Sequence, residues 1–469
     1  MIVRSKWIVA ITAILGVCGC HSAAPQGAVE RARVRAEVVQ RTGSDVWTGD
    51  ESAGAVCARL LAEPLTPATA VKIAVLNNPV VIASYERLGV ARADLVQAGL
   101  LSNPVFSANA KFFSAGPEIE LGLAQSFVDL FFIPLRRRVA AADVRAAEAG
   151  VARELVSLVY DVRRSFVIAL AGESVVAARR ESLVAATTQR DLVRTLHDAG
   201  NVPDSQRTLL EAGAVRAQLD LLQAEAAARA AREPLYVLLG LRDSSPKVEV
   251  VGDIDAQPGG VVEEAEAVSR AVTRSLDLAE SSALVESAAH AAGLSRQESV
   301  FPGLDLGVVG KREADGPWGF GPSFSAALPI FDYGQARNLR AGAVCRQRAA
   351  RHAALTLEVQ SAARVLRDRA ETLREHVRSL REEYLPLRTR LVRETVQQYN
   401  AMQIGAFEVL TARQQEADAQ REHIETARDA WLARLDLDEL LAGSLNRERV
   451  LSVPHSEAAA PMTEGGHER

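Results

Sequence analysis

The stretch WGFGPSFSAALPI, residues 318–330, alternates large apolar side chains with small ones. Its large apolar residues occupy even-numbered positions: Trp318, Phe320, Phe324 and Leu328. The odd-numbered positions include Gly319, Ser323 and Ser325. An alternation with period two predicts a β-strand with one apolar and one polar face. We therefore expect the four large side chains to face lipid and the small polar ones to face a lumen, as in outer-membrane strands.

Three more segments show a similar pattern, so the sequence predicts four strands, at about 102–113, 117–130, 301–312 and 317–332. Each is long enough to cross a bilayer when tilted. Membrane strands must close into a barrel, and barrels begin at about eight strands. Several copies of the chain would therefore have to associate. The alternative is a pair of soluble hairpins that cap a helical bundle.

Long helical segments surround the strands, and their order occurs twice at an offset of roughly 200 residues, which indicates an internal duplication. The expected helices lie at about 66–100, 136–199, 204–239, 262–297, 335–399 and 407–441. The segment 136–199 alone would measure about 96 Å at 1.5 Å per residue. Apolar residues at spacings of 3 and 4 over 359–391 predict a coiled coil. Pro386 should kink that helix. We assign the repeats to 65–240 and 261–443.

The N-terminus is typical of a secretion signal. Arg4 and Lys6 precede an apolar run of about 11 residues, which is too short to span a bilayer. The run ends in Val17-Cys18-Gly19-Cys20, which resembles the lipobox of bacterial lipoproteins. Residues 1–19 would then be the signal peptide, and Cys20 would carry the acyl chains, with palmitate among them. Residues 20–64 would form a tether, and 444–469 a polar tail.

Composition excludes several protein classes. The 469 residues are 48% apolar with a net charge of −5, which fits neither a polytopic helical membrane protein nor a nucleic-acid-binding protein. The sequence contains no G-x-S-x-G, P-loop or H-E-x-x-H motif, so we expect no enzyme and no cofactor. The eight histidines are scattered, which leaves a metal site unsupported. Cys57 and Cys345 are expected to be unpaired, although a bridge between them stays open.

Four motifs resemble those of the TolC family of outer-membrane efflux channels. They are AVLNNP at 74–79, LPIFDYG at 328–334, Leu385-Pro386, and the segment from Tyr399 through Ile404-Gly405-Ala406 to Leu410. The resemblance covers nearly all of 65–443. Met402 departs from the family pattern, which often has glycine there, and Ser126 and Val128 depart from it in the first repeat.

The resemblance implies a mainly α protein with a small membrane β part. Three chains would form one 12-stranded β-barrel in the outer membrane of a Gram-negative bacterium, and their long helices a periplasmic α-barrel of about 100 Å. The homotrimer would be a passive conduit for drugs or heavy-metal ions, paired with a periplasmic adaptor and an inner-membrane pump. The lipobox favours the lipidated branch. A type I secretion conduit of this fold and a pore-less coiled-coil lipoprotein are the alternatives.

Two helix turns are the expected adaptor-binding tips. The first comprises Gly200, Asn201 and Val202, and the second Ile404, Gly405 and Ala406. Both join long helices far from the strands and should occupy matching places in the duplication. In the other interpretation, these glycines only end helices.

Overall fold

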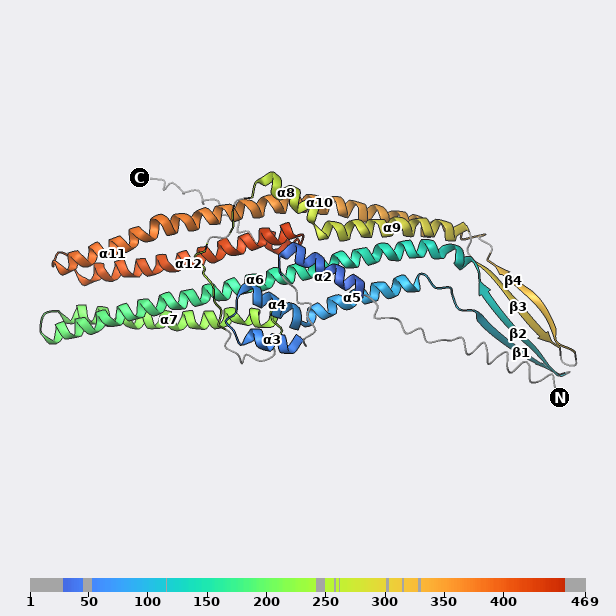
Figure 1. The fold of residues 1–469 in the computed structure, drawn as a ribbon, viewed down its shortest axis with the longest axis horizontal. Helices are drawn as coiled ribbons and strands as arrows, with labels where there is room; N and C mark the ends of the chain where they lie inside the picture. The colour runs from blue at the N-terminus through green and yellow to red at the C-terminus, as the bar shows by residue number, and fades with distance from the viewer. Residues whose placement is uncertain are drawn as a thin grey trace, which may run out of the picture.

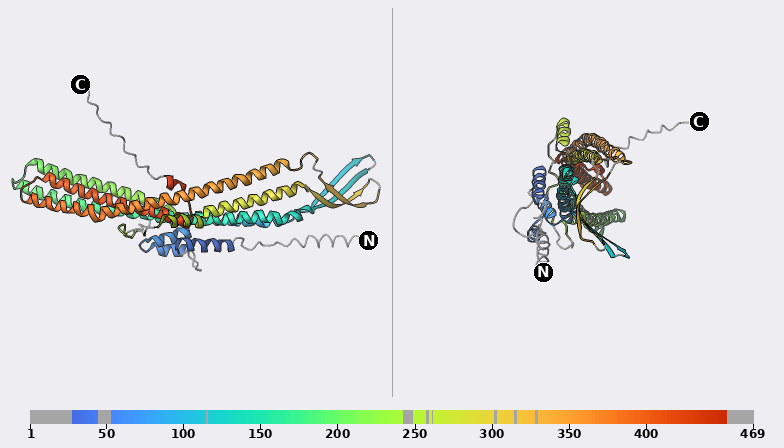
Figure 2. Two further views of the ribbon diagram at one scale, coloured as in Figure 1. Left: turned by 90° about the horizontal axis from the view of Figure 1, so that it is seen from above. Right: turned by 90° about the vertical axis from the view of Figure 1, so that its right-hand side faces the viewer.

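The computed structural model describes residues 28–44, 53–114, 116–241, 249–256, 259–260, 262–300, 303–313, 316–327 and 330–451. The chain forms a long, narrow bundle of helices with a small sheet at one end (Figure 1). The view from above in Figure 2 shows the same elongated shape, and the end-on view beside it shows the narrow cross-section. None of the helices in the described ranges is both long and apolar enough to cross a membrane.

The sheet is antiparallel and has the order β1-β2-β3-β4. Its strands are β1 (Val105–Phe113), β2 (Gly116–Ser126), β3 (Leu304–Arg312) and β4 (Gly319–Ala326). They are shorter than the spans 102–113, 117–130, 301–312 and 317–332 expected from the pattern. Pairing sets these limits, since Ala326 is opposite Leu304, the first residue of β3. The second expected span, 117–130, is shorter for another reason, because a helix begins at Val128.

In the first repeat, the expected helix 66–100 is two helices, α4 (Pro67–Asn77) and α5 (Pro79–Gln97). Asn78 interrupts them with an extended backbone (φ −75°, ψ 122°) because a residue before proline avoids the helical region. Its side chain accepts a hydrogen bond from Val80 N at 2.8 Å and donates one to Leu238 O at 2.9 Å. The repeat continues with α6 (Val128–Asp198) and α7 (Asp204–Leu238).

In the second repeat, the expected helix 262–297 is also divided, into α8 (Glu264–Arg274) and α9 (Leu276–Val300). Ser275 is extended (ψ 118°), and Leu276 N donates to Gly443 O at 2.8 Å instead of continuing a helix. Gly443, with φ +112°, ends the helix α12 (Ala406–Ala442). A distant helix end therefore fixes this break.

The expected helix 335–399 consists of α10 (Gln335–Ser379), the π-helix η1 (Leu380–Tyr384) and α11 (Leu385–Asn400). Pro386 has no N–H for an ordinary helical hydrogen bond. The backbone one residue earlier has changed its pattern, since Leu385 N donates to Leu380 O. The irregularity expected at Pro386 is thus a π-helical turn immediately before it.

The flanking segments are helical as well. Within the stretch expected to be a tether, α2 (Ala28–Thr42) packs on α5 and α6, and α3 (Ala53–Leu61) packs on α4. After α12, α13 (Arg447–Leu451) lies against α10. The main core surrounds the middle of α6, where Phe166 and Val162 are buried with Ile73 of α4 and Leu235 of α7.

Candidate functional site

The sheet has one apolar face that runs through all four strands. The register places Phe106 opposite Leu123, Leu123 opposite Val308, and Gly310 opposite Phe320. With alternation along each strand, the face collects these residues: Phe106, Ala108, Ala110, Phe112, Ile119, Leu121, Leu123, Leu306, Val308, Phe320 and Phe324. Two polar residues, Gln125 and Arg312, share this face near the strand ends. Most of the large side chains in it are exposed. An apolar surface this extensive is abnormal for a water-exposed sheet and typical of a lipid-facing one.

The opposite face is mainly polar or small, with Val105, Phe113 and Val309 as its large apolar exceptions. It carries Ser107, Asn109, Lys111, Glu118, Glu120, Gly122, Asp305, Gly307, Lys311, Ser323 and Ser325. Lys311 Nζ lies 2.8 Å from Glu118 Oε1 across β2 and β3. Most of these side chains are short, so this face leaves space in front of it.

Glycine at position 310 is required by packing. A Cβ there would come within 2.8 Å of the Phe320 ring, which lies over it from β4. Phe320 in turn stacks on Trp318 with ring centroids 6.2 Å apart. The arrangement covers a glycine with an aromatic ring, which pins the register of β3 against β4.

Of the side chains expected to face lipid, Phe320 and Phe324 lie on the apolar face and are 76% and 69% exposed, and Trp318 adjoins them at 39%. Leu328 lies outside the described residues, as do Cys20 and the rest of the lipobox. Contact with lipid remains a prediction for these residues.

The far end of the bundle has two helix turns of the same design. In the first, Gly200 N donates to His197 O and Asn201 N to Leu196 O. In the second, Met402 N donates to Tyr399 O and Gln403 N to Gln398 O. Gly200 and Met402 both have left-handed backbones, with φ of +75° and +59°. Both turns are therefore Schellman endings.

This geometry corrects the expected match between the tips. Gly200 corresponds to Met402, and Val202 to Ile404. Gly405 corresponds to Pro203, since each is the residue before a helix. The sets 200–202 and 404–406 therefore lie in equivalent turns but are shifted by two residues, because the helix hydrogen bonds, and not the glycines, define the equivalence.

Sequence reasoning missed two features of the tips. Met402 is 94% exposed, although it has a backbone that usually requires glycine. Gln206 Nε2 donates to Tyr399 Oη at 3.1 Å, which joins the two tips. The roughly 200-residue offset between the repeats could have revealed the role of Met402. Nothing in the sequence pattern indicates the hydrogen bond between Gln206 and Tyr399. Around the first tip, His197 Nε2 lies 3.0 Å and Arg207 Nη2 3.2 Å from Asp204 Oδ1.

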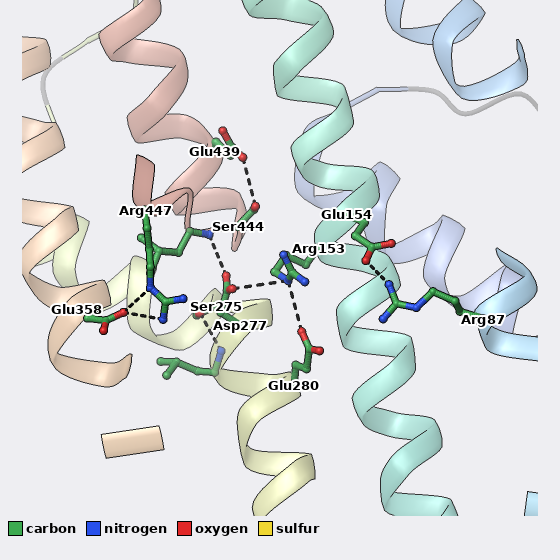
Figure 3. A network of polar contacts seen from close by, with 12 residues as sticks. Arg87, Arg153, Glu154, Ser275, Asp277, Glu280, Glu358, Glu439, Ser444 and Arg447 are labelled. Carbon is green, nitrogen blue, oxygen red and sulfur yellow. Dashed lines mark hydrogen bonds and ion pairs between the residues drawn. The ribbon is translucent and has the colours of Figure 1, made fainter. Parts of the chain in front are cut away.

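A network of charges joins the two repeats at the middle of the bundle (Figure 3). Arg153 of α6 lies 3.6 Å from Asp277 and 3.4 Å from Glu280, both on α9 (Figure 3). Asp277 also accepts a hydrogen bond from Leu445 N at 2.8 Å.

Beside this network, Arg449 of α13 contacts Asp161 of α6 and Glu439 of α12. Glu439 is 1% exposed, and burial raises its pKa to about 7. The C-terminal segment therefore closes over the buried Glu439 of the second repeat and the half-buried Asp161 of the first.

Within the described residues, no group of three or more His, Cys, Asp or Glu side chains is placed to hold a metal ion. Cys57 is buried and Cys345 half-buried, and both are free thiols.

Solved outer-membrane channels share this architecture. CusC superposes with a TM-score of 0.69 at 16% identity, over 81% of this chain and 92% of that one. The outer-membrane channel OprN superposes with a TM-score of 0.67 at 17% identity, over 86% and 95%. The chain has the TolC fold. The Campylobacter jejuni outer-membrane channel CmeC, with a TM-score of 0.66 at 14% identity, has it over 81% and 86%.

No protein-family model matches the sequence, and no curated protein matches it significantly. The TolC fold is nevertheless what the four short motifs predicted, and a mainly α chain with a small β part is confirmed. In the TolC fold of this chain, the two-faced sheet and the paired tips are at opposite ends of one bundle (Figure 1).

Proposed function

We propose that this chain is the outer-membrane channel of a tripartite efflux system. The sheet would cross the outer membrane, and the helices would extend into the periplasm as a passive conduit. The observation that carries the proposal is the two-faced sheet, apolar on one side and polar on the other, at the end of a shaft in which α6 alone spans 71 residues, or about 106 Å.

The open edges of the subunit support assembly into a ring. In the sheet, β1 and β4 each lack a neighbour on one side. Near the sheet the helices pack in the order α5-α6-α9-α10, and near the tips in the order α7-α6-α12-α11. At every level one edge therefore belongs to the first repeat and the other to the second. Contact between unlike edges is heterologous, and it closes into a ring when the rotation allows.

The helical edges carry exposed large apolar residues, as an unfilled interface would. They are Val80, Ile82 and Val90 on α5, Leu339 and Leu357 on α10, Val215, Leu219 and Leu222 on α7, and Leu387 and Leu391 on α11. A soluble monomer would not leave such rows in water.

Three copies fit the sheet best. Two would give eight strands, whose interior is filled by side chains, whereas three give twelve and leave a lumen. The proposed cargo is drugs or metal ions. The proposed partners are a periplasmic adaptor, which docks on the tips, and an inner-membrane pump.

The test is conductance in planar bilayers. Purified protein should form stable channels and run as a heat-modifiable trimer on gels. A monomer that inserts no channel under conditions where its helices fold would support the pore-less lipoprotein instead.

Lipid anchoring at Cys20 is a separate part of the proposal. Cys20→Ala should abolish acylation and slow maturation, yet leave the barrel able to insert, because the strands supply their own membrane affinity. Mass spectrometry of the mature N-terminus decides this, and an unmodified Cys20 in the wild-type protein would refute it.

A further inference from the structure

Four exposed arginines lie close to the sheet end of the bundle: Arg137 and Arg138 on α6, and Arg337 and Arg340 on α10. None of them makes an ion pair within the described part of the chain, whereas the neighbouring Arg136 pairs with Asp129 at 2.8 Å. Arg137 follows Asp129 by eight residues (137 − 129), and Arg340 follows Asp332 by the same number (340 − 332). Both repeats thus place an arginine at the same point.

The acidic residues near these arginines pair with other groups: Glu30, Glu148 and Glu286 lie around one pocket with Arg138 but pair with Arg92, Arg33 and Arg145. From Gln335 to Leu357, α10 carries arginines at 337, 340, 346, 348 and 351 and no acidic residue. Asp129 is already occupied by Ser102 and Arg136. Asp332 accepts a hydrogen bond from Gly334 N at 2.8 Å. Any partner for the four arginines must therefore bring negative charge from outside the subunit.

Exposed apolar side chains lie between the arginines and the sheet. Leu130 and Phe131 precede Arg137 and Arg138 by seven residues each, which is two helical turns, so all four share one face of α6. Phe131 is 76% exposed, and Phe331, just before α10, is 91% exposed. Along the molecule the order is an apolar sheet face, then exposed aromatics, then unpaired arginines.

That order matches the layers of a membrane interface, where aromatic rings lie at the headgroup level and basic residues meet anionic headgroups. A second copy of the chain fits less well. It would dock at the open edges, and α10 with Arg337 and Arg340 is an edge helix, but α6 with Arg137 and Arg138 is flanked by α5 and α9 near the sheet and is not. An edge contact therefore does not account for all four arginines.

We propose that Arg137, Arg138, Arg337 and Arg340 form a basic collar that binds the phosphates of anionic phospholipids in the periplasmic leaflet of the outer membrane. The planar guanidinium group suits this task because it can donate two parallel hydrogen bonds to one phosphate. The inference rests on the proposed function, since it requires the sheet to be in the membrane.

The test measures lipid retention by the full-length trimer. Wild-type protein in neutral detergent is mixed with phosphatidylglycerol or with phosphatidylcholine, and bound lipid is counted by native mass spectrometry. Each arginine near an anionic surface contributes about fivefold in affinity. Wild type should therefore prefer phosphatidylglycerol by at least about tenfold, and the variant with Arg→Gln at all four positions should lose that preference.

The matched control is Arg390→Gln with Arg393→Gln, two exposed arginines on α11 at the tip end. It should retain the wild-type preference. The collar is refuted if the four-site variant retains as much phosphatidylglycerol as wild type, or if inorganic phosphate displaces the lipid at equal concentration. A trimer that dissociates in the four-site variant would assign these arginines to a subunit interface instead. Conductance of the four-site variant in neutral bilayers tests the channel separately, and it should equal that of wild type.

Discussion

At the scale of the residue, the two faces of the sheet differ most between neighbours on β4. Phe324 is on the apolar face and Ser323 on the polar one. Phe324→Arg should cost about 2–4 kcal/mol of folding stability in lipid, because the charge would enter the hydrocarbon region, while Ser323→Arg should cost little. Urea titrations of both variants in lipid vesicles measure this. Equal costs would show that the assigned faces are wrong.

Met402 has a left-handed backbone that glycine adopts more easily. Because its side chain is 94% exposed, Met402→Gly removes almost no packing. We expect the variant to gain about 0.5–1 kcal/mol of folding stability. The gain is the strain relieved in the left-handed backbone, minus the cost of the entropy that glycine adds to the unfolded chain. The control is Gly200→Ala, at the equivalent position of the other tip, which should lose a similar amount of folding stability. A destabilised Met402→Gly variant would mean that the side chain packs in the assembled protein.

At the scale of the element, the second tip is expected to dock the adaptor. Gly405 has an extended backbone (φ −86°, ψ 172°), so other residues can occupy its place, and a Cβ would meet only the end of the Glu408 side chain, at 3.1 Å. Gly405→Arg should therefore spare folding and place a bulky charge where a partner must approach. Resistance to the exported compound should fall while trimer amount and conductance stay normal.

Gly405→Ala is the matched control, because it adds only a methyl group, and it should keep resistance. If resistance is also unchanged in Gly405→Arg, the tip is only a helix turn and the adaptor binds elsewhere.

At the scale of the whole molecule, the buried Glu439 under α13 makes the stability of this contact between the repeats sensitive to pH. Burial raises the pKa of Glu439 to about 7, above the 4.5 of an exposed glutamate. The folded state then holds its proton more tightly than the unfolded state, so this group adds stability as the pH falls from about 7 to about 4.5 and adds nothing further outside that range.

Glu439→Gln fixes a neutral side chain and removes this dependence. The stability of the variant relative to wild type should therefore be greater at pH 8 than at pH 4.5, by up to about 3 kcal/mol. Denaturant unfolding at the two pH values measures the difference. Parallel stability curves for the two proteins would show that Arg449 keeps Glu439 ionised throughout.

The sequence by itself determined the periodic features: four alternating strands, long helices in a repeated order, and a turn at each tip. These follow from side-chain period and from local breakers such as Pro386, which act over a few residues. It also indicated the TolC fold through four short motifs, although no more than 17% of residues are identical in the solved channels compared.

Only the tertiary structure decided features that depend on partners distant in sequence. The register of β2 against β3 joins strands about 190 residues apart and makes one continuous apolar face. The break at Ser275 exists because Leu276 donates to Gly443. Gly200 and Met402 are equivalent because their turns make the same backbone hydrogen bonds. The two side chains are so different that the sequence does not indicate this equivalence. In each case the deciding contact joins groups that folding alone brings together.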